Sequence, residues 1–510
     1  MAGPGAPTPA STLSRNIGAA LAAQSLTLLL LLVVGRSLFR TLGGEAFGLI
    51  NFSSTVCTAL AGVLDLGTTS TVVREVAANR GHDSEYVDRV LRSASTVCWA
   101  TYALAAIAIT WSSSLLVSGW LHLDTLEPSR AAHVLAVLTV SGLLALPRGV
   151  YAASLRGIDR LDLASRIDAA AVTVQQAGAL GLALTGAGIG GVALWLATVH
   201  VGWNAAYAAV VRRHFGGGVL RLAIDPAAVR RNLRFSRSML GISALATVHS
   251  HADRVILSGL LPVTRFGYYA FGYSLVSRGA VLASAVSQAA LPALSAQFAR
   301  EDRSSLLARY HRLQAFVCYG AAVLFAAVPF AVVPVFSMVF DHAAAWELLA
   351  PLSLVALGFF LNSTITVPYM LSLAAGQPGI TVRLNLHALW VTLPATAGLV
   401  VRFGLLGAGL SWVFYHLFAY AYAFPRICRA CLGLSPLVCA RPTLGALGLA
   451  LASYGPAWAA ARAAGAGTLA MSAAFAVGTL LFLLGAVRLT GMDTRAWRAR
   501  LGLVSFPDGA

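Results

Sequence analysis

The chain has 510 residues, of which 58% are hydrophobic and only 11% charged. Soluble domains carry about 25% charged residues, so an ordinary soluble enzyme, a disordered chain and a secreted disulfide scaffold are excluded. The apolar residues fall in repeated blocks of about 20 residues, the length that crosses about 30 Å of hydrocarbon. The composition therefore predicts a polytopic membrane protein.

The predicted elements begin after a short N-terminal stretch. Residues 1–14 are rich in Pro, Ala and Thr and lack the basic region of a signal peptide, so we expect a disordered cytoplasmic tail. The apolar segments that follow are predicted to be helices, because a backbone in lipid must satisfy its own hydrogen bonds. The fourteen segments are 15–39, 46–73, 91–117, 131–154, 166–185, 189–211, 238–261, 267–298, 312–337, 347–374, 381–401, 405–425, 442–460 and 468–488.

The positive charge is carried by arginine, since the sequence contains no lysine, and the net charge is +17. The arginines gather between alternate pairs of predicted helices, which follows the positive-inside rule. This pattern predicts that both termini and the central loop are cytoplasmic, and it argues against a nucleic-acid partner. The arginine-rich stretches are 80–92, 156–166, 212–237, 300–312, 426–441 and 488–500.

An internal repeat is visible at an offset of 219 residues. Each copy holds six helices, so both have the same orientation, as in transporters built from parallel repeats. The matches are Phe47-Gly48 with Phe266-Gly267, Phe52 with Phe271, Gly157 with Gly376, and Gly188-x-Gly190 with Gly407-x-Gly409. The predicted parts are an N-lobe (15–211), a basic cytoplasmic linker (212–237), a C-lobe (238–425), two further helices with the loop before them (426–490) and a cytoplasmic tail (491–510).

Four arginines lie within or at the ends of apolar segments, where a charge is costly and usually functional. Arg278 is the deepest, about 16 Å from the outer surface, and Arg254, Arg36 and Arg40 are the others. Because Arg binds phosphate oxygens in bidentate fashion, we expect all four to bind a diphosphate. The alternatives are that Arg254 and Arg278 pair with Asp253 or with backbone carbonyls, and that Arg36 and Arg40 extend to the outer interface.

Three further ionisable residues are candidates for ion coupling. His249 and Asp253 lie on one stripe of the seventh helix, and a histidine titrates near physiological pH. Asp65 lies near the inner end of the second helix. The alternative for Asp65 is an interfacial cap or a salt bridge with Arg74 or Arg166.

No pattern in the sequence predicts covalent catalysis. A Gly-rich phosphate loop needs a lysine, and the chain has none. Cys428-x-x-Cys431 has a spacing typical of zinc sites, but no second pair completes such a site. We therefore expect a protein that is not an enzyme, with no cofactor and no metal. Its energy would come from an ion gradient, the membrane potential or the gradient of its substrate.

Short motifs resemble those of polysaccharide-transport proteins. Arg40-Thr-Leu-Gly-Gly-Glu-Ala-Phe-Gly resembles their R-x-L-G-x-x-x-(Y/F)-G signature between the first two helices. Asp65-Leu-Gly followed by Arg74 is similar to their D-L-G-x(6)-R element. Further similarities are Asp253-Arg254-Val-Ile-Leu-Ser-Gly with Phe266-Gly267-Tyr268-Tyr269, Pro292-Ala-Leu-Ser, and Gly376-Gln377. The match covers nearly the whole chain, with motifs that are moderately specific together and weak singly.

The resemblance is to lipid-linked oligosaccharide flippases of the multidrug/oligosaccharidyl-lipid/polysaccharide exporter (MOP) superfamily. It implies an all-α, V-shaped fold with two six-helix lobes, often with two more helices, and alternating access. It also implies transport of undecaprenyl-diphosphate-linked glycan across the bacterial cytoplasmic membrane for O-antigen, capsule or exopolysaccharide assembly. Membrane lipids, a polysaccharide polymerase and glycosyltransferases would be the partners. Cationic cavity residues are typical of the group; Arg254 lies in a matched motif, whereas Arg278 rests on its depth.

Three other functions remain open. A drug or cation antiporter of the same superfamily typically has acidic residues in its first lobe, whereas the deep groups here are mainly arginine. A peptidoglycan-precursor (lipid II) flippase shares the fourteen helices and the cationic cavity, but the motifs around Asp65 and Asp253 count against it. A membrane scaffold without cargo would leave the buried arginines without a purpose.

Overall fold

The computed structural model describes residues 27–490 except for residues 80, 300–301 and 378. The tails predicted at 1–14 and 491–510, and the first part of the helix predicted at 15–39, lie outside the described residues. In the part that is described, the chain is helical and contains no β-strand. A single isolated β-bridge joins His122 and Pro262. The prediction of an all-α protein is confirmed.

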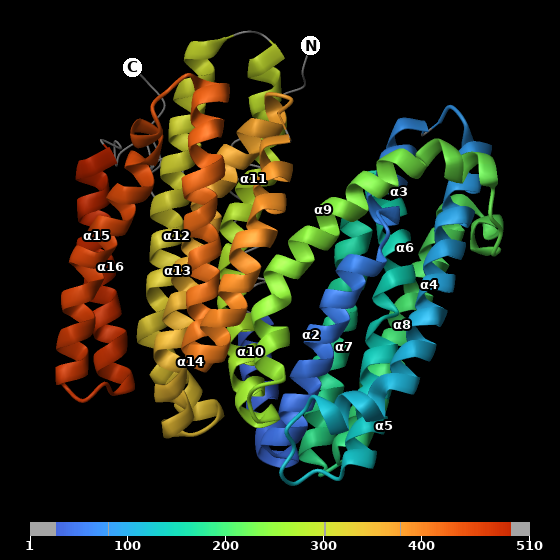
Figure 1. The fold of residues 1–510 in the computed structure, drawn as a ribbon, viewed down its shortest axis with the longest axis horizontal. Helices are drawn as coiled ribbons and strands as arrows, with labels where there is room; N and C mark the ends of the chain where they lie inside the picture. The colour runs from blue at the N-terminus through green and yellow to red at the C-terminus, as the bar shows by residue number, and fades with distance from the viewer. Residues whose placement is uncertain (1–26, 80, 300–301, 378, 491–510) are drawn as a thin grey trace, which may run out of the picture. The chain divides into compact units, whose positions relative to one another are not determined.

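The helices follow one another with short connections (Figure 1). Residues 27–42 are helical. The helices after them are α2 (Gly44–Leu64), α3 (Thr68–Asn79), α4 (Ser84–Gly119), α5 (Pro128–Gly142), α6 (Ala145–Gly157), α7 (Leu161–Leu184), α8 (Ile189–Phe215), α9 (Pro226–Ser258), α10 (Val263–Ser277), α11 (Val281–Ala299), α12 (Arg303–Val339), α13 (His342–Ala374), α14 (Gly379–Ile427), α15 (Pro436–Ala463) and α16 (Thr468–Thr490), with short turns η1 (Gly217–Leu220), η2 (Arg278–Ala280) and η3 (Cys428–Leu432).

Among the described residues, ten helices are long and apolar enough to cross a membrane. One of them spans two predicted segments, because α14 continues past Gly404, whose φ of 56° bends the helix between 381–401 and 405–425. Every predicted segment that is described coincides with a helix or with a pair of helices. The protein is therefore a multi-pass membrane protein.

The helix predicted over 46–73 is interrupted at residues 65–67. Leu66 and Gly67 have φ of 52° and 74°, which ends α2 because an α-helix needs negative φ. The Asp65 carboxylate accepts hydrogen bonds from the Thr68 hydroxyl and the Thr69 backbone N–H, both at 3.3 Å. These bonds satisfy donors that are free at the start of α3. The capping role that was one alternative for Asp65 is thus present.

Two more predicted helices are interrupted. The one expected over 131–154 breaks between α5 and α6, about one turn before Pro147, whose missing N–H interrupts helical hydrogen bonding. The one expected over 267–298 breaks at η2, directly after Ser277. The Ser277 hydroxyl donates to the carbonyl of Ser274 at 2.9 Å, a contact that bends helices.

Polar caps fix where several helices begin. Each capping side chain accepts from a backbone N–H in the first turn, and such caps contribute about 1 kcal/mol each. The caps are Asp83 for α4, Asp225 for α9, Asp302 for α12, Asp341 for α13 and Ser435 for α15. Hydrogen bonds from Ser305 and Ser304 lower the pKa of Asp302, so this cap keeps its charge at neutral pH.

The chain forms two compact units. The N-terminal unit comprises residues 30–271 and 393–404, and the C-terminal unit comprises the described residues of 1–29, 272–392 and 405–510. The predicted linker 212–237 is largely helical: residues 216–225 lie between α8 and α9, and α9 begins at Pro226. The lobe boundaries 15–211 and 238–425 remain a prediction.

Each unit has its own apolar core. In the N-terminal unit, side chains of α3, α4, α6 and α8 pack together, with Val72, Leu91 and Leu155 fully buried. In the C-terminal unit, α11 to α14 contribute the core, including Val317 and Val367. Figure 1 shows α15 and α16 side by side as an antiparallel pair within this unit. These cores hold the helices that carry the ionisable residues.

Candidate functional site

Two adjacent ionisable residues of α9, Asp253 and Arg254, are both largely buried, with side chains 3% and 11% exposed. Arg254 Nε lies 3.6 Å from Asp253 Oδ1, and Nη2 donates to the Ser250 carbonyl. The Tyr269 hydroxyl donates to Asp253 Oδ2 at 3.2 Å. Arg254 therefore pairs with a carboxylate and a backbone carbonyl, which is the arrangement given as the alternative to phosphate binding.

Arg278 lies in the 3₁₀ turn η2, between α10 and α11. Its side chain is half-buried, and its Nε is buried with no hydrogen-bond partner among the described residues. The turn is tightly packed, because a β-carbon on Gly279 would lie 2.8 Å from the Phe325 ring. A 3₁₀ turn inside a long helix often marks a functional hinge, and an intramembrane cation usually serves a ligand or a partner. Arg278 is thus the leading candidate for anion binding in the C-terminal unit.

The remaining predicted residues, Arg36, Arg40 and His249, also belong to the N-terminal unit. Arg36 is half-buried and Arg40 is exposed on the helix formed by residues 27–42. His249 is half-buried on α9, one turn before Asp253. The structure thus brings Asp253 and Arg254 together, and it uses Asp65 in the α3 cap. Their roles in binding or coupling stay predictions.

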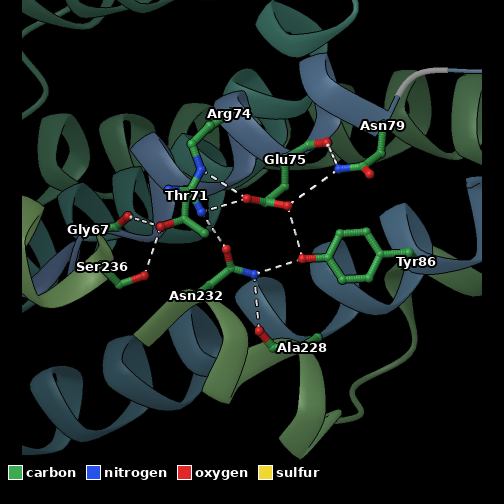
Figure 2. A network of polar contacts seen from close by, with 9 residues as sticks. All are labelled: Gly67, Thr71, Arg74, Glu75, Asn79, Tyr86, Ala228, Asn232 and Ser236. Atoms are coloured by element: carbon green, nitrogen blue, oxygen red, sulfur yellow. Dashed lines mark hydrogen bonds and ion pairs between the residues drawn. The ribbon is translucent and has the colours of Figure 1, made fainter. Parts of the chain in front are cut away.

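A network of polar side chains that the sequence did not indicate joins α3, α4 and α9 (Figure 2). Arg74 donates to Glu75 Oε1 at 2.6 Å and to Asn232 Oδ1 at 2.7 Å. Asn232 Nδ2 donates to the Tyr86 hydroxyl at 3.0 Å, and that hydroxyl donates to Glu75 Oε2 at 2.9 Å. The Arg74 guanidinium also lies over the Phe235 ring, 3.8 Å from its centroid.

This network gives the arginine of the D-L-G-x(6)-R element a structural role. Arg74 is committed to a carboxylate, an amide and an aromatic ring, so it holds α9 against α3 rather than presenting a free cation to a ligand. Its acidic partner, Glu75, is its neighbour in sequence, whereas Asn232 lies 158 residues away. No spacing pattern in one sequence links residues so far apart.

The structure places Cys428 and Cys431 in the turn η3, directly after α14. Within the described ranges, no group of three or more His, Cys, Asp or Glu side chains could hold a metal ion. Cys428 is buried and Cys431 half-buried in the turn η3, at the inner end of α14 according to the predicted topology.

Comparison with known proteins identifies the family. The family described as "Polysaccharide biosynthesis protein" matches residues 13–298, which is more than half of the chain. The chain belongs to this family. Among curated proteins, the "Putative O-antigen transporter" of Shigella flexneri is similar to this chain. The two are 21% identical over 396 residues, which cover 74% of this chain and 88% of the relative. The resemblance stated from the motifs is confirmed.

Solved structures with the same fold are transporters of the MOP superfamily. A lipid II flippase, MurJ, in an inward closed conformation has a TM-score of 0.70 at 11% identity. The match covers 92% of the present chain and 98% of the MurJ chain. An inward-facing multidrug resistance MATE transporter has a TM-score of 0.63 at 15% identity, covering 80% and 98%. A MOP transporter from Pyrococcus furiosus has a TM-score of 0.57 at 14% identity, covering 84% and 96%. These likenesses confirm the predicted fold class.

Proposed function

We propose that the protein is a flippase that carries undecaprenyl-diphosphate-linked oligosaccharide from the inner to the outer leaflet of a bacterial cytoplasmic membrane. It would work by alternating access and supply glycan for a cell-surface polysaccharide, with both termini in the cytoplasm. The family match and the Shigella relative support transport in polysaccharide biosynthesis. A polymerase and glycosyltransferases would act on the same glycolipid and are its proposed partners.

Arg278 is the observation that carries the proposal. A half-buried guanidinium whose buried Nε has no partner within the described chain is costly unless an anion reaches it. The diphosphate is the one strongly anionic group of a lipid-linked oligosaccharide, and arginine binds phosphate oxygens in bidentate fashion. In this proposal, Arg278 binds the diphosphate during transport.

The other three arginines each have a different role in the proposal. Arg254 is held in place by its contacts with Asp253 and the Ser250 carbonyl. It contributes positive charge to the substrate path in the N-terminal unit. Arg36, which is half-buried, contacts the diphosphate in one stage of the cycle. Arg40, which is exposed, attracts the headgroup at the membrane interface.

The test is a complementation experiment in cells depleted of the protein. The leaflet that holds the lipid-linked oligosaccharide is measured with a membrane-impermeant reagent for its sugars. Depletion should trap the glycolipid in the inner leaflet, and the native chain should release it. Arg278→Gln should fail, Arg278→Lys should restore part of the transport because it keeps the charge, and the exposed Arg130→Gln should act like the native chain.

Two results would count against the proposal. Normal export by a well-expressed Arg278→Gln variant would remove the role of Arg278. Unchanged glycolipid in depleted cells, together with increased sensitivity to cationic drugs, would instead support a multidrug antiporter.

A lipid II flippase is the second candidate, because the chain shares the fold of one over 92% of its length. Lipid II is also a diphosphate-linked lipid, so the same argument from Arg278 applies. The depletion experiment separates the two candidates: trapped lipid II and cell lysis would support the second, and trapped oligosaccharide in viable cells would support the first.

A further inference from the structure

A second group of polar and ionisable side chains in the N-terminal unit, buried or partly buried except for the exposed Asp168, has no part in the proposed diphosphate site. Its members face one another from three helices, and all lie in the described chain. They are Arg148 on α6, Asp168 on α7, and His200, Trp203, Asn204 and Tyr207 on α8.

Trp203 is the centre of this α6–α8 cluster. The Arg148 guanidinium lies over its ring, 3.9 Å from the centroid, and the His200 ring is nearly parallel to it, at 6.1 Å and 6°. Trp203 Nε1 donates to Asp168 Oδ1 at 3.1 Å, and the Tyr207 hydroxyl donates to the same oxygen at 2.8 Å. Both the tryptophan and the tyrosine thus donate hydrogen bonds to the Asp168 carboxylate. Arg148 is close enough to interact electrostatically with Asp168 but forms no direct ion pair with it.

Three buried polar atoms of the cluster have no hydrogen-bond partner among the residues that the structure describes: Arg148 Nη1, His200 Nδ1 and Asn204 Oδ1. The other end of the Asn204 amide donates to the Leu144 carbonyl at 2.8 Å, at the break between α5 and α6. Leaving such atoms unsatisfied is costly in an apolar interior. A half-satisfied network at a helix break is therefore expected to have another arrangement in which these groups find partners.

The cluster lies within the predicted membrane segments 131–154, 166–185 and 189–211, with Asp168 two residues after the start of the second. Arg148 is nine residues before Gly157, where α6 ends, and Trp203 is twelve residues before Phe215, where α8 ends. At about 1.5 Å per residue these positions are about 14 and 18 Å from the helix ends. Ionisable residues at such depth are rare and usually belong to ion or proton pathways.

We propose that the α6–α8 cluster is a proton-exchange site, in which uptake of a proton by His200 drives Arg148 from the Trp203 ring onto Asp168. The proton adds to Nδ1 of neutral His200, the atom that has no partner. The imidazolium then repels the nearby guanidinium, while the Asp168 carboxylate attracts it. Loss of the proton to the other side of the membrane restores the observed arrangement.

The charged groups around His200 allow this exchange. Arg148 faces it from α6, and Asp168 lies beyond Trp203 on α7. Two further cations are Arg156, eight residues after Arg148 on α6, and Arg166, two residues before Asp168 on α7. The helix α5 also packs against α8, but its ionisable residues lie in its first two turns. Arg130, for example, lies 3.4 Å from the position of a β-carbon on Gly188, at the opposite end of α8 from the cluster.

Only the coupling of the proton to transport rests on the proposed function. The first test therefore measures protonation of the site without the substrate. The fluorescence of Trp203 is obtained in vesicles as the difference between the native chain and Trp203→Phe, and is followed as the pH is lowered from about 8 into the acid range. We expect one titration step. It should vanish in His200→Gln and persist in His133→Gln, which alters an exposed histidine of α5.

Variants that remove one charge from the cluster should shift the midpoint of the Trp203 titration in opposite directions. A purely structural role of these residues would not produce such opposite shifts. Arg148→Gln removes the repulsion and should raise the titration midpoint by about one pH unit or more, and Asp168→Asn removes the attraction and should lower it. A step that survives in His200→Gln, or midpoints that move in the same direction in both variants, would overturn the proposal. If His200→Gln does not fold, the two opposite shifts decide alone.

A second measurement links the site to transport. Vesicles that contain a diphosphate-linked oligosaccharide should show transport accelerated by a pH gradient, and His200→Gln should lose that acceleration. If the native protein moves no such lipid but Trp203 titrates as described, the proton site stands and the proposed function fails. If transport depends on the gradient equally in both proteins, the proton site fails and the proposed function stands.

Discussion

Gly48 of α2 and Gly267 of α10 meet with no room for a side chain between them. A β-carbon on Gly267 would lie 2.5 Å from the Gly48 Cα, and one on Gly48 would lie 2.2 Å from the Val263 carbonyl oxygen. These two glycines occupy equivalent places in the two sequence repeats. The close approach of the helices therefore explains why both copies have glycine after phenylalanine.

The aromatic neighbours of these glycines are paired reciprocally. Phe47 packs against Phe271 with ring centroids 5.3 Å apart, and Phe52 packs against Phe266 at 5.9 Å. Since Phe47 corresponds to Phe266 and Phe52 to Phe271, exchanging the repeats turns one pair into the other. Such reciprocal contacts are the signature of a two-fold relation. Within the N-terminal unit, the segments around Gly48 and Gly267 are thus related by a local two-fold exchange.

Alanine at either glycine should destabilise the protein. Gly48→Ala or Gly267→Ala forces the backbones apart, and we expect a loss of about 1–3 kcal/mol, as for other overpacked cores. Thermal unfolding in detergent measures the loss. Gly448→Ala on α15 meets nothing within 4 Å and should be neutral or slightly stabilising. Equal stability of all three variants would show that the contact is loose.

Asn232 should be important for the attachment of α9. Asn232→Leu removes the acceptor of Arg74 and the donor to Tyr86, both in a buried position. The expected cost is about 1–3 kcal/mol, measured by chemical unfolding. Arg230→Gln, at an exposed site of the same helix, should change stability by less than about 0.5 kcal/mol. The account of Figure 2 fails if the two variants are equally stable.

Glu45, which is also buried, holds the connection between α4 and α5. Its carboxylate accepts from the backbone N–H groups of Thr125 at 2.9 Å and Leu126 at 2.7 Å, and from the Thr125 hydroxyl at 2.8 Å. Glu45→Gln would place an amide donor against these donors, so we expect a loss of about 1.5–3 kcal/mol. Limited proteolysis should then cut this connection faster. Glu127→Gln, in the same connection but exposed, serves as the control and should resist cleavage like the native chain.

Asp253 and Tyr269 should contribute to stability to different degrees. Tyr269→Phe removes one hydrogen bond to the carboxylate and should cost about 1 kcal/mol. Asp253→Asn breaks the buried pair with Arg254 and should cost about 3–5 kcal/mol. A double-mutant cycle of the two separates their contributions. If Asp253→Asn is as stable as the native chain but loses its response to a pH gradient, Asp253 is an ion-coupling residue rather than a structural partner of Arg254.

The helices could be predicted because their signal is local. A run of apolar residues that is long enough to cross the bilayer must be helical wherever it lies, and the alternation of arginine sets the expected orientation. The interruptions were missed because they depend on single residues inside such runs. Pro147 and Ser277 each disturb a helix that the hydropathy of the whole segment predicts as continuous.

The polar networks were harder to predict than the helices. Arg74 belongs to a recognised motif, but its partner Asn232 is defined only by the packing of α9 against α3. The α6–α8 cluster left a clearer signal, since Arg148 and His200 both interrupt apolar blocks. The depth argument that singled out Arg278 would have found them too. Partners within a cluster, in contrast, follow from three-dimensional packing alone.

The most direct test of the proposed function is transport by the purified protein in vesicles. A lipid-linked diphosphate oligosaccharide is placed in one leaflet, and its arrival in the other is followed with an impermeant sugar-oxidising reagent. The native chain should move it. Arg278→Gln should be at least about tenfold slower, because a charge-assisted hydrogen bond contributes about 1.5–3 kcal/mol, and Arg278→Lys should be intermediate. Movement no faster than in protein-free vesicles, or equal rates for the native chain and Arg278→Gln, would contradict the account.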